Sequence, residues 1–188
     1  MKNTRLENWI GKIAILIIQP ESYVHISNEI PVELVKEWGM KGIIVSANKP
    51  FMIAKEHLQK LDVLSSLRYL DCASTIAGAN PQAENLFLIN NPADLTSLGI
   101  CIHKCVTSTS EREFLIVDSL TTLLIYNKEK DLIAFAHQLG LTLKSIRITT
   151  FFLMVDMETT KEMLKFLSTI ADKTVHLRVN KKGEVFIE

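Results

Sequence analysis

Polar side chains that could bind a small ligand follow the first long apolar run, residues 13–18. Glu21 and His25 lie there with Ser22 and Tyr23, which together offer a carboxylate, an imidazole and two hydroxyl groups. No Gly-x-Ser-x-Gly turn accompanies them, and residues that are neighbours in sequence do not by themselves form a catalytic triad. These residue types therefore favour a binding role over a catalytic one.

A second candidate for chemistry is the pair Cys101 and Cys105, with His103 between them. Residues four apart share one face of a helix, so both thiols could bind one metal ion, whereas His103 would point elsewhere. Zinc takes four ligands, and no second pair of Cys or His stands at ligand spacing. We therefore expect no metal site and no cofactor, and interpret the two cysteines as part of a buried helix face.

The elements that must position these residues alternate between strand and helix along nearly the whole chain. Short runs rich in Ile, Val, Leu and Phe predict strands at 13–18, 42–46, 67–71, 86–89, 114–118, 149–155 and 174–179. Several runs are apolar almost throughout, which is typical of strands that helices cover on both faces. The order predicts an α/β fold, a three-layer, doubly wound and mostly parallel sheet. Gly183, between two short apolar segments, predicts a C-terminal β-hairpin.

The segments between the strands carry helix signals. Asn28 and Pro31 predict that the first helix begins near residue 31, so that the segment before it is a loop. Pro50 opens a second helix, with Ile53 expected on its inner face. Residues 120–126 are interpreted as a connecting segment with exposed apolar side chains, a candidate subunit contact. Three more helices are expected: after Asn91-Pro92, over 132–146 with a possible break at Gly140, and from Thr159 or Thr160.

The composition favours one domain over residues 1–188 in a reducing cytoplasm. Hydrophobic residues make up 47% of the chain and charged residues 22%, a balance typical of globular domains. Lys+Arg and Asp+Glu number 21 each, so neither nucleic acid nor a membrane surface is favoured as a partner. The apolar run 13–18 is far shorter than the roughly 20 residues that span a membrane. Three cysteines show no disulfide pattern.

Residues 111–120 read Glu-Arg-Glu-Phe-Leu-Ile-Val-Asp-Ser-Leu, an apolar run that leads into Asp118-Ser119. With residues 91–100 and 170–177, this stretch resembles the Walker B strand and its surroundings in the archaeal RadA/KaiC-type ATPases, the RecA/KaiC-like superfamily. The resemblance covers about 86–178 and implies that fold, an archaeal character and side-by-side assembly. It also implies that Asp118 and Ser119 lie where the family holds Mg²⁺; the alternative is a carboxylate that only caps a central strand.

The first half departs from this family at two places that ATP hydrolysis needs. In the family, a glycine-rich loop ending in Lys and Ser/Thr follows the first strand, because its backbone N–H groups wrap the phosphates. Residues 19–28 read Gln-Pro-Glu-Ser-Tyr-Val-His-Ile-Ser-Asn, without glycine or lysine, and Glu21 would repel phosphate. The family's water-activating glutamates follow the second strand, whereas residues 47–50 read Ala-Asn-Lys-Pro. We therefore do not expect ATP hydrolysis.

Two functions remain open on the sequence. One is a non-catalytic RecA/KaiC-like domain, a pseudo-ATPase with a regulatory or protein-interaction role, working as a homo-oligomer, most simply a dimer, or with an unidentified protein partner. The alternative is a small-molecule or nucleotide-binding module that uses the crevice at the strand carboxyl ends. For that crevice we predict the ligand-binding residues Glu21, His25, Asn48, Asp118 and Ser119. An unrelated enzymatic reaction in the same crevice has the least support.

Overall fold

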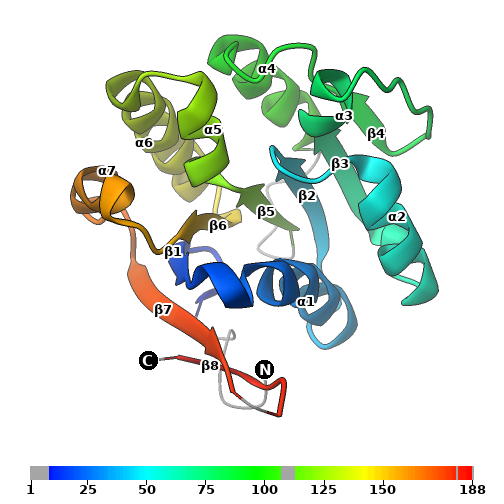
Figure 1. The fold of residues 1–188 in the computed structure, drawn as a ribbon, viewed down its shortest axis with the longest axis horizontal. Helices are drawn as coiled ribbons and strands as arrows, with labels where there is room; N and C mark the ends of the chain where they lie inside the picture. Colours follow the sequence, from blue (N-terminus) through cyan, green and yellow to red (C-terminus); the bar gives the residue numbers. More distant parts are fainter. Residues whose placement is uncertain (1–8, 107–112, 181, 188) are drawn as a thin grey trace.

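The computed structural model describes residues 9–106, 113–180 and 182–187, and within them eight strands form one sheet (Figure 1). The strand order is β4-β3-β2-β5-β6-β1-β7-β8. Neighbouring strands are parallel except for the last pair, β7 and β8, which form an antiparallel hairpin. The predicted α/β fold with a mostly parallel sheet and a C-terminal hairpin is therefore confirmed.

The predicted strands are present, with bounds that differ from the expected ones by a residue at most. They are β1 Ile13–Ile18, β2 Lys41–Ser46, β3 Leu67–Asp71, β4 Leu86–Leu88, β5 Glu113–Asp118, β6 Thr149–Val155, β7 Lys173–Val179 and β8 Val185–Ile187. Every residue of β1 and of β5 is buried. The apolar runs 13–18 and 114–117 follow from this, because parallel strands covered on both faces have no solvent side.

Helices connect the parallel strands. They are α1 Tyr23–Lys36, α2 Phe51–Lys60, α3 Ala73–Ile76, α4 Leu95–Cys105, α5 Leu120–Tyr126, α6 Glu129–Ser145 and α7 Lys161–Leu167, with 3₁₀ turns at Pro20–Ser22, Leu64–Ser66 and Glu158–Thr160. None of the helices in the described part of the chain is both long and apolar enough to cross a membrane.

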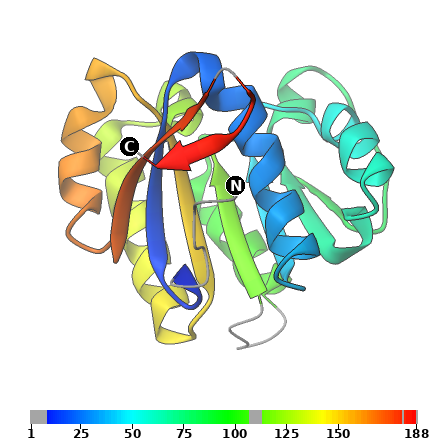
Figure 2. The same ribbon diagram turned by 90° about the horizontal axis from the view of Figure 1, so that it is seen from below.

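The sheet is the middle layer of three, with helices packed on both faces (Figure 2). Successive residues of β1 contribute to opposite layers: Ile13, Ile15 and Ile17 pack in the core under α4, α5, α6 and α7. The alternate residues Ala14, Leu16 and Ile18 pack in the core under α1 and α2. The period of two along each strand therefore divides the apolar interior between the two helical layers.

Helix α1 begins at Tyr23, so the prediction that the segment before Pro31 is a loop was wrong. The 3₁₀ turn Pro20–Ser22 leads straight into the helix. A stripe of large side chains at helical spacing is buried along it: Tyr23, Ile26, Ile30 and Leu34. Burial of this stripe outweighs the cost of a proline inside a helix, about 3 kcal/mol.

Three other expectations about helices are corrected. Residues 120–126 form helix α5 and not an irregular connection, and Leu120 and Leu123 are fully buried in the core, whereas Ile125 and Tyr126 are exposed, as expected. Ile53 is exposed, because α2 begins at residue 51 and buries positions 51, 54 and 58. Helix α6 continues without a break through Gly140, where the neighbouring side chains leave little space for a Cβ atom.

Gly42 of β2 has no room for a side chain. It pairs with Phe114 of β5, and a Cβ atom at this position would lie 2.1 Å from the ring atom Cζ of that fully buried phenylalanine. We expect Gly42→Ala to lower the free energy of unfolding by about 2–3 kcal/mol through overpacking. Urea denaturation measures this, with Gly99→Ala as the control, because that glycine has room for a methyl group. Equal stability of the two variants would contradict the prediction.

Candidate functional site

Three polar residues end adjacent parallel strands at the carboxyl edge of the sheet. Ser46 ends β2 and lies in register with Asp71 at the end of β3 on one side and with Asp118 at the end of β5 on the other. All three are buried, with Asp118 5% exposed. The peptide bond that joins Asp118 to Ser119 is cis. Ligands of doubly wound folds bind at this edge, so these residues form the floor of the candidate site.

Tyr23 covers the carboxylate of Asp118. Its phenol group donates a hydrogen bond to Asp118 Oδ1, and the tyrosine is itself buried, 7% exposed. Burial raises the pKa of Tyr23 well above its ordinary value, and the charge of Asp118 raises it further. Because only Gln19 and one 3₁₀ turn separate β1 from α1, the first residue of the helix is held directly over the end of β5.

Burial also raises the pKa of Asp118, against the opposing effects of the Tyr23 hydrogen bond and of the positive charge of Lys49. Lys49 is half-buried, and its ammonium group donates a hydrogen bond to Asn28 Oδ1 on α1. Burial lowers the pKa of Lys49, while the nearby Asp118 raises it. A buried carboxylate, a tyrosine hydroxyl and a half-buried ammonium group therefore share one small polar cluster.

The carboxylate of Asp71 is fully occupied by hydrogen bonds. It accepts from the backbone N–H groups of Phe51 at 2.7 Å, Ala73 at 2.8 Å and Ser74 at 2.8 Å. The Ser74 hydroxyl donates a fourth bond at 2.6 Å. These donors belong to the first turns of α2 and α3, where backbone N–H groups lack partners within the helix. Asp71 is thus a structural residue that joins both helices to β3.

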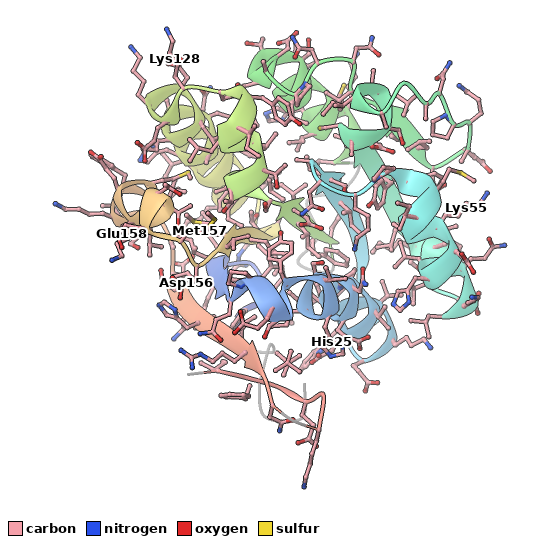
Figure 3. All side chains as sticks on the ribbon, viewed as in Figure 1. His25, Lys55, Lys128, Asp156, Met157 and Glu158 are labelled. Atoms are coloured by element: carbon pink, nitrogen blue, oxygen red, sulfur yellow. The ribbon has the colours of Figure 1, made fainter. Side chains whose placement is uncertain are left out.

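The structure brings only part of the predicted ligand-binding set together. Ser119 adjoins Asp118 and is buried, but its hydroxyl caps α5 by accepting from Thr122 N at 3.1 Å. Glu21 and Asn48 are exposed. His25 is exposed on the side of α1 that faces the hairpin, where its Nε2 lies 3.0 Å from Gly183 O (Figure 3).

The predicted ligand-binding set left out the two residues that do act on Asp118, Tyr23 and Lys49, although the sequence placed Tyr23 beside Glu21 and His25. The signal for both is that they lie in the segments after β1 and β2, whose carboxyl ends lie at the same edge of the sheet as that of β5.

The two cysteines of α4 do not form part of this cluster. Cys105 is buried, as expected, while Cys101 is half-buried. Burial raises the pKa of the Cys105 thiol to about 11, which disfavours the thiolate that metals bind. Within residues 9–106, 113–180 and 182–187, no group of three or more His, Cys, Asp or Glu side chains is arranged to hold a metal ion.

The buried carboxyl group predicts a characteristic dependence of stability on pH. Because the pKa of Asp118 is raised in the folded state, the folded protein keeps its proton when the unfolded chain, with a carboxyl pKa of about 3.9, has lost it. The resulting stabilisation is complete below that unfolded pKa and is lost as the pH rises through the raised folded pKa. We expect Asp118→Asn to remove this loss and to be more stable than the wild type at pH 7.

Urea unfolding of both proteins between about pH 4 and 8 measures this difference. The amide oxygen of Asn can still accept from Tyr23, so the comparison isolates the buried charge. A variant that is less stable than the wild type at pH 7 would mean that the ionised carboxylate stabilises the fold.

Comparisons with known proteins agree with the architecture. The chain matches a family described as "Family of unknown function (DUF7504)" over residues 43–177. No curated protein matches it. Among solved structures it is similar to the KaiC-like protein PH0186 of the hyperthermophilic archaeon Pyrococcus horikoshii OT3, with a TM-score of 0.65 and 12% identity over 95% of this chain and 78% of that one.

The chain is also similar to the uncharacterized protein PH0321 of Pyrococcus horikoshii, which was solved in complex with an unknown peptide. That similarity has a TM-score of 0.67 and 13% identity over 94% of this chain and 83% of the other. Together with the eight-stranded, mostly parallel sheet, these two likenesses show a RecA/KaiC-like fold.

Proposed function

The chain belongs to the family of unknown function DUF7504, and from this premise we propose that it is a pseudo-ATPase, a non-catalytic domain over residues 1–188 that acts through protein association. The observation that carries the proposal is the contact between Tyr23 and Asp118. In the RecA/KaiC-like family the corresponding carboxylate lies beside Mg²⁺ and the nucleotide phosphates. In this chain the buried hydroxyl group of Tyr23 donates a hydrogen bond to that carboxylate.

Charge at the carboxyl edge also supports the proposal. A metal ion needs the ionised carboxylate, but burial raises the pKa of Asp118 and so favours the neutral form. Directly after β2, where the family has glutamates that activate water, the chain has Asn48 and Lys49. A lysine cannot act there as an acceptor for the proton of the attacking water while it is charged. The chain thus lacks the phosphate loop and the base of the ATPase reaction, and burial disfavours the ionised carboxylate that a metal ion needs.

Protein association is the role that the remaining features favour. The composition has no net charge to attract nucleic acid or a membrane surface. One solved protein with this fold, the uncharacterized protein of Pyrococcus horikoshii, was determined with an unknown peptide bound to it. A regulatory domain that keeps the scaffold and binds other proteins is consistent with both observations.

An ATP hydrolysis assay with a matched variant tests the non-catalytic part of the proposal. Phosphate release from Mg·ATP is measured for the wild type and for Asp118→Asn, purified in the same way. We expect both to equal the buffer blank. Hydrolysis by the wild type that the variant loses would show a working metal site and overturn the proposal. Stabilisation of the wild type by ADP or ATP without hydrolysis would favour the nucleotide-binding alternative instead; ligand at 100 times its Kd adds about 2.7 kcal/mol.

A further inference from the structure

A groove of about 480 Å³ lies between α4 and α6, on the helical layer that covers one face of the sheet. The ring of Phe135 on α6 forms part of its floor: a Cβ atom on Gly99 of α4 would lie 3.5 Å from Phe135 Cε2. Phe135 is half-buried, and Ile100, which also lines the groove, is 49% exposed. The middle of the groove is therefore an apolar surface that contacts solvent. Its volume lies within the range of about 300–1,000 Å³ in which proteins bind small molecules.

Polar side chains line both ends of this apolar middle. Thr96 and Asp131, from the first turns of α4 and α6, lie at one end. His103 of α4 and Gln138 of α6 lie at the other end. Along α6, Asp131 and Gln138 are two helical turns apart, about 10 Å. The groove therefore has the shape of an elongated site, polar at its ends and apolar between them.

The polar side chains at the two ends are not used to hold the fold together. In the part of the chain that the structure describes, the side chains of Asp131, His103 and Gln138 form no hydrogen bond or ion pair with another residue. The carboxylates of Asp71 and Asp172, by contrast, bond to other groups of the chain. The carboxylate, the imidazole and the amide of the groove are thus available to a ligand.

The charge of the groove favours a cation at the Asp131 end. Asp131 is the one carboxylate among the described residues that line the groove, and neither Lys104 nor Lys130 lines it. A protonated amine complements a carboxylate through charge-assisted hydrogen bonds. Phe135 lies one turn from Asp131 on the same face of α6, and the face of an aromatic ring also attracts a cation.

The other end of the groove favours a group that both donates and accepts hydrogen bonds. The imidazole of His103 and the amide of Gln138 each offer a donor and an acceptor. A hydroxyl group has the same two capacities, so it complements both side chains without requiring a charge.

We propose that the groove between α4 and α6 binds a small, elongated amine, with its ammonium group at Asp131, an apolar or aromatic body against Phe135 and Ile100, and a hydroxyl group at His103 and Gln138. The inference goes beyond the proposed function. The groove shares no residue with the polar cluster around Asp118, so the amine site is independent of whether the carboxyl edge binds a nucleotide.

Titration of the full chain with three related compounds, followed by nuclear magnetic resonance, tests the site. Tyramine carries the ammonium group, the ring and the hydroxyl group; tyrosol has a neutral hydroxyl in place of the ammonium group, and phenethylamine lacks the ring hydroxyl. We expect tyramine to shift the amide signals of Gly99 and Ala134 with a Kd of about 1 mM or tighter. Tyrosol should bind at least about 10-fold more weakly and phenethylamine about 3-fold more weakly.

Asp131→Asn is the matched variant, because it removes the charge and keeps the size of the side chain. It should bind tyramine and tyrosol with equal affinity. Asp62→Asn is the control: Asp62 is also exposed, but it lines a different groove, with Phe87, and its replacement should leave the preference for tyramine unchanged. Circular dichroism checks that both variants are folded.

Three results would overturn the amine site. One is the absence of saturable shifts in the wild type up to about 10 mM tyramine, a concentration about tenfold above the expected Kd. The second is equal affinity of the wild type for tyramine and tyrosol. The third is a preference for tyramine that Asp131→Asn keeps or that Asp62→Asn removes.

Discussion

Replacing Asp71 with alanine is expected to lower the free energy of unfolding by about 4 kcal/mol, among the largest effects of any single substitution in this chain. The substitution removes the acceptor of four hydrogen bonds, from Phe51 N, Ala73 N, Ser74 N and Ser74 Oγ. Donors that stay buried without a partner cost about 1–3 kcal/mol each, and structural relaxation recovers part of that sum. Urea denaturation followed by circular dichroism measures the loss.

Asp71→Asn is the matched control for this substitution. The amide keeps one acceptor oxygen and nearly the same volume, so we expect about half the loss. The alanine variant should reduce protection of the Phe51 amide from hydrogen exchange, because that N–H group then loses its acceptor. A loss below about 1 kcal/mol for alanine would contradict the assignment of Asp71 as the residue that joins α2 and α3 to the sheet.

Replacing Tyr23 with alanine should be similarly severe, at about 4 kcal/mol. Removal of a buried aromatic ring leaves a cavity, which costs about 3–5 kcal/mol in protein cores. Tyr23→Phe separates the ring from its hydroxyl: it keeps the packing and removes the hydrogen bond to Asp118, at an expected cost of about 2 kcal/mol. Urea denaturation of the wild type, Tyr23→Phe and Tyr23→Ala at pH 7 gives the free-energy cost of losing the hydrogen bond and the cost of losing the ring.

The hydroxyl should also change how stability depends on pH. The Tyr23 hydrogen bond lowers the pKa of Asp118, so the phenylalanine variant should raise that pKa further. Because a raised pKa stabilises the folded state only while the carboxyl is protonated, the Tyr23→Phe protein should lose more stability than the wild type as the pH rises from about 4. Identical pH profiles for the two proteins would mean that the bond has no energetic role.

The strands could be predicted from the sequence because a buried parallel strand leaves a direct signal. The run 13–18 is apolar throughout and 149–155 is apolar after its two threonines, and each became a strand with the expected bounds. The residue at which α1 begins could not be predicted from the sequence pattern. Asn28 and Pro31 are typical of a helix start, and the signal that outweighs them, burial of Tyr23 against the sheet, depends on tertiary packing.

The site was predicted less fully than the fold. Asp118 and Ser119 were expected at a strand end and lie there. Which side chains reach them depends on the neighbours of β5 in the sheet, and that strand order joins segments far apart in the sequence. The direction in which each side chain of α1 points also matters. Tyr23 and His25 are two residues apart, about 200° around the helix, so Tyr23 faces Asp118 and His25 faces the hairpin.

The central proposal, that this chain is a pseudo-ATPase whose Asp118 carboxylate accepts a hydrogen bond from Tyr23, is tested most directly by calorimetric titration of the wild type with Mg·ATP. We predict no saturable heat, which corresponds to a Kd weaker than about 1 mM, or less than about 4 kcal/mol of binding free energy. Tyr23→Phe should behave in the same way, because the segment after β1 still lacks glycine and lysine. A wild-type Kd below about 100 μM would contradict the claim.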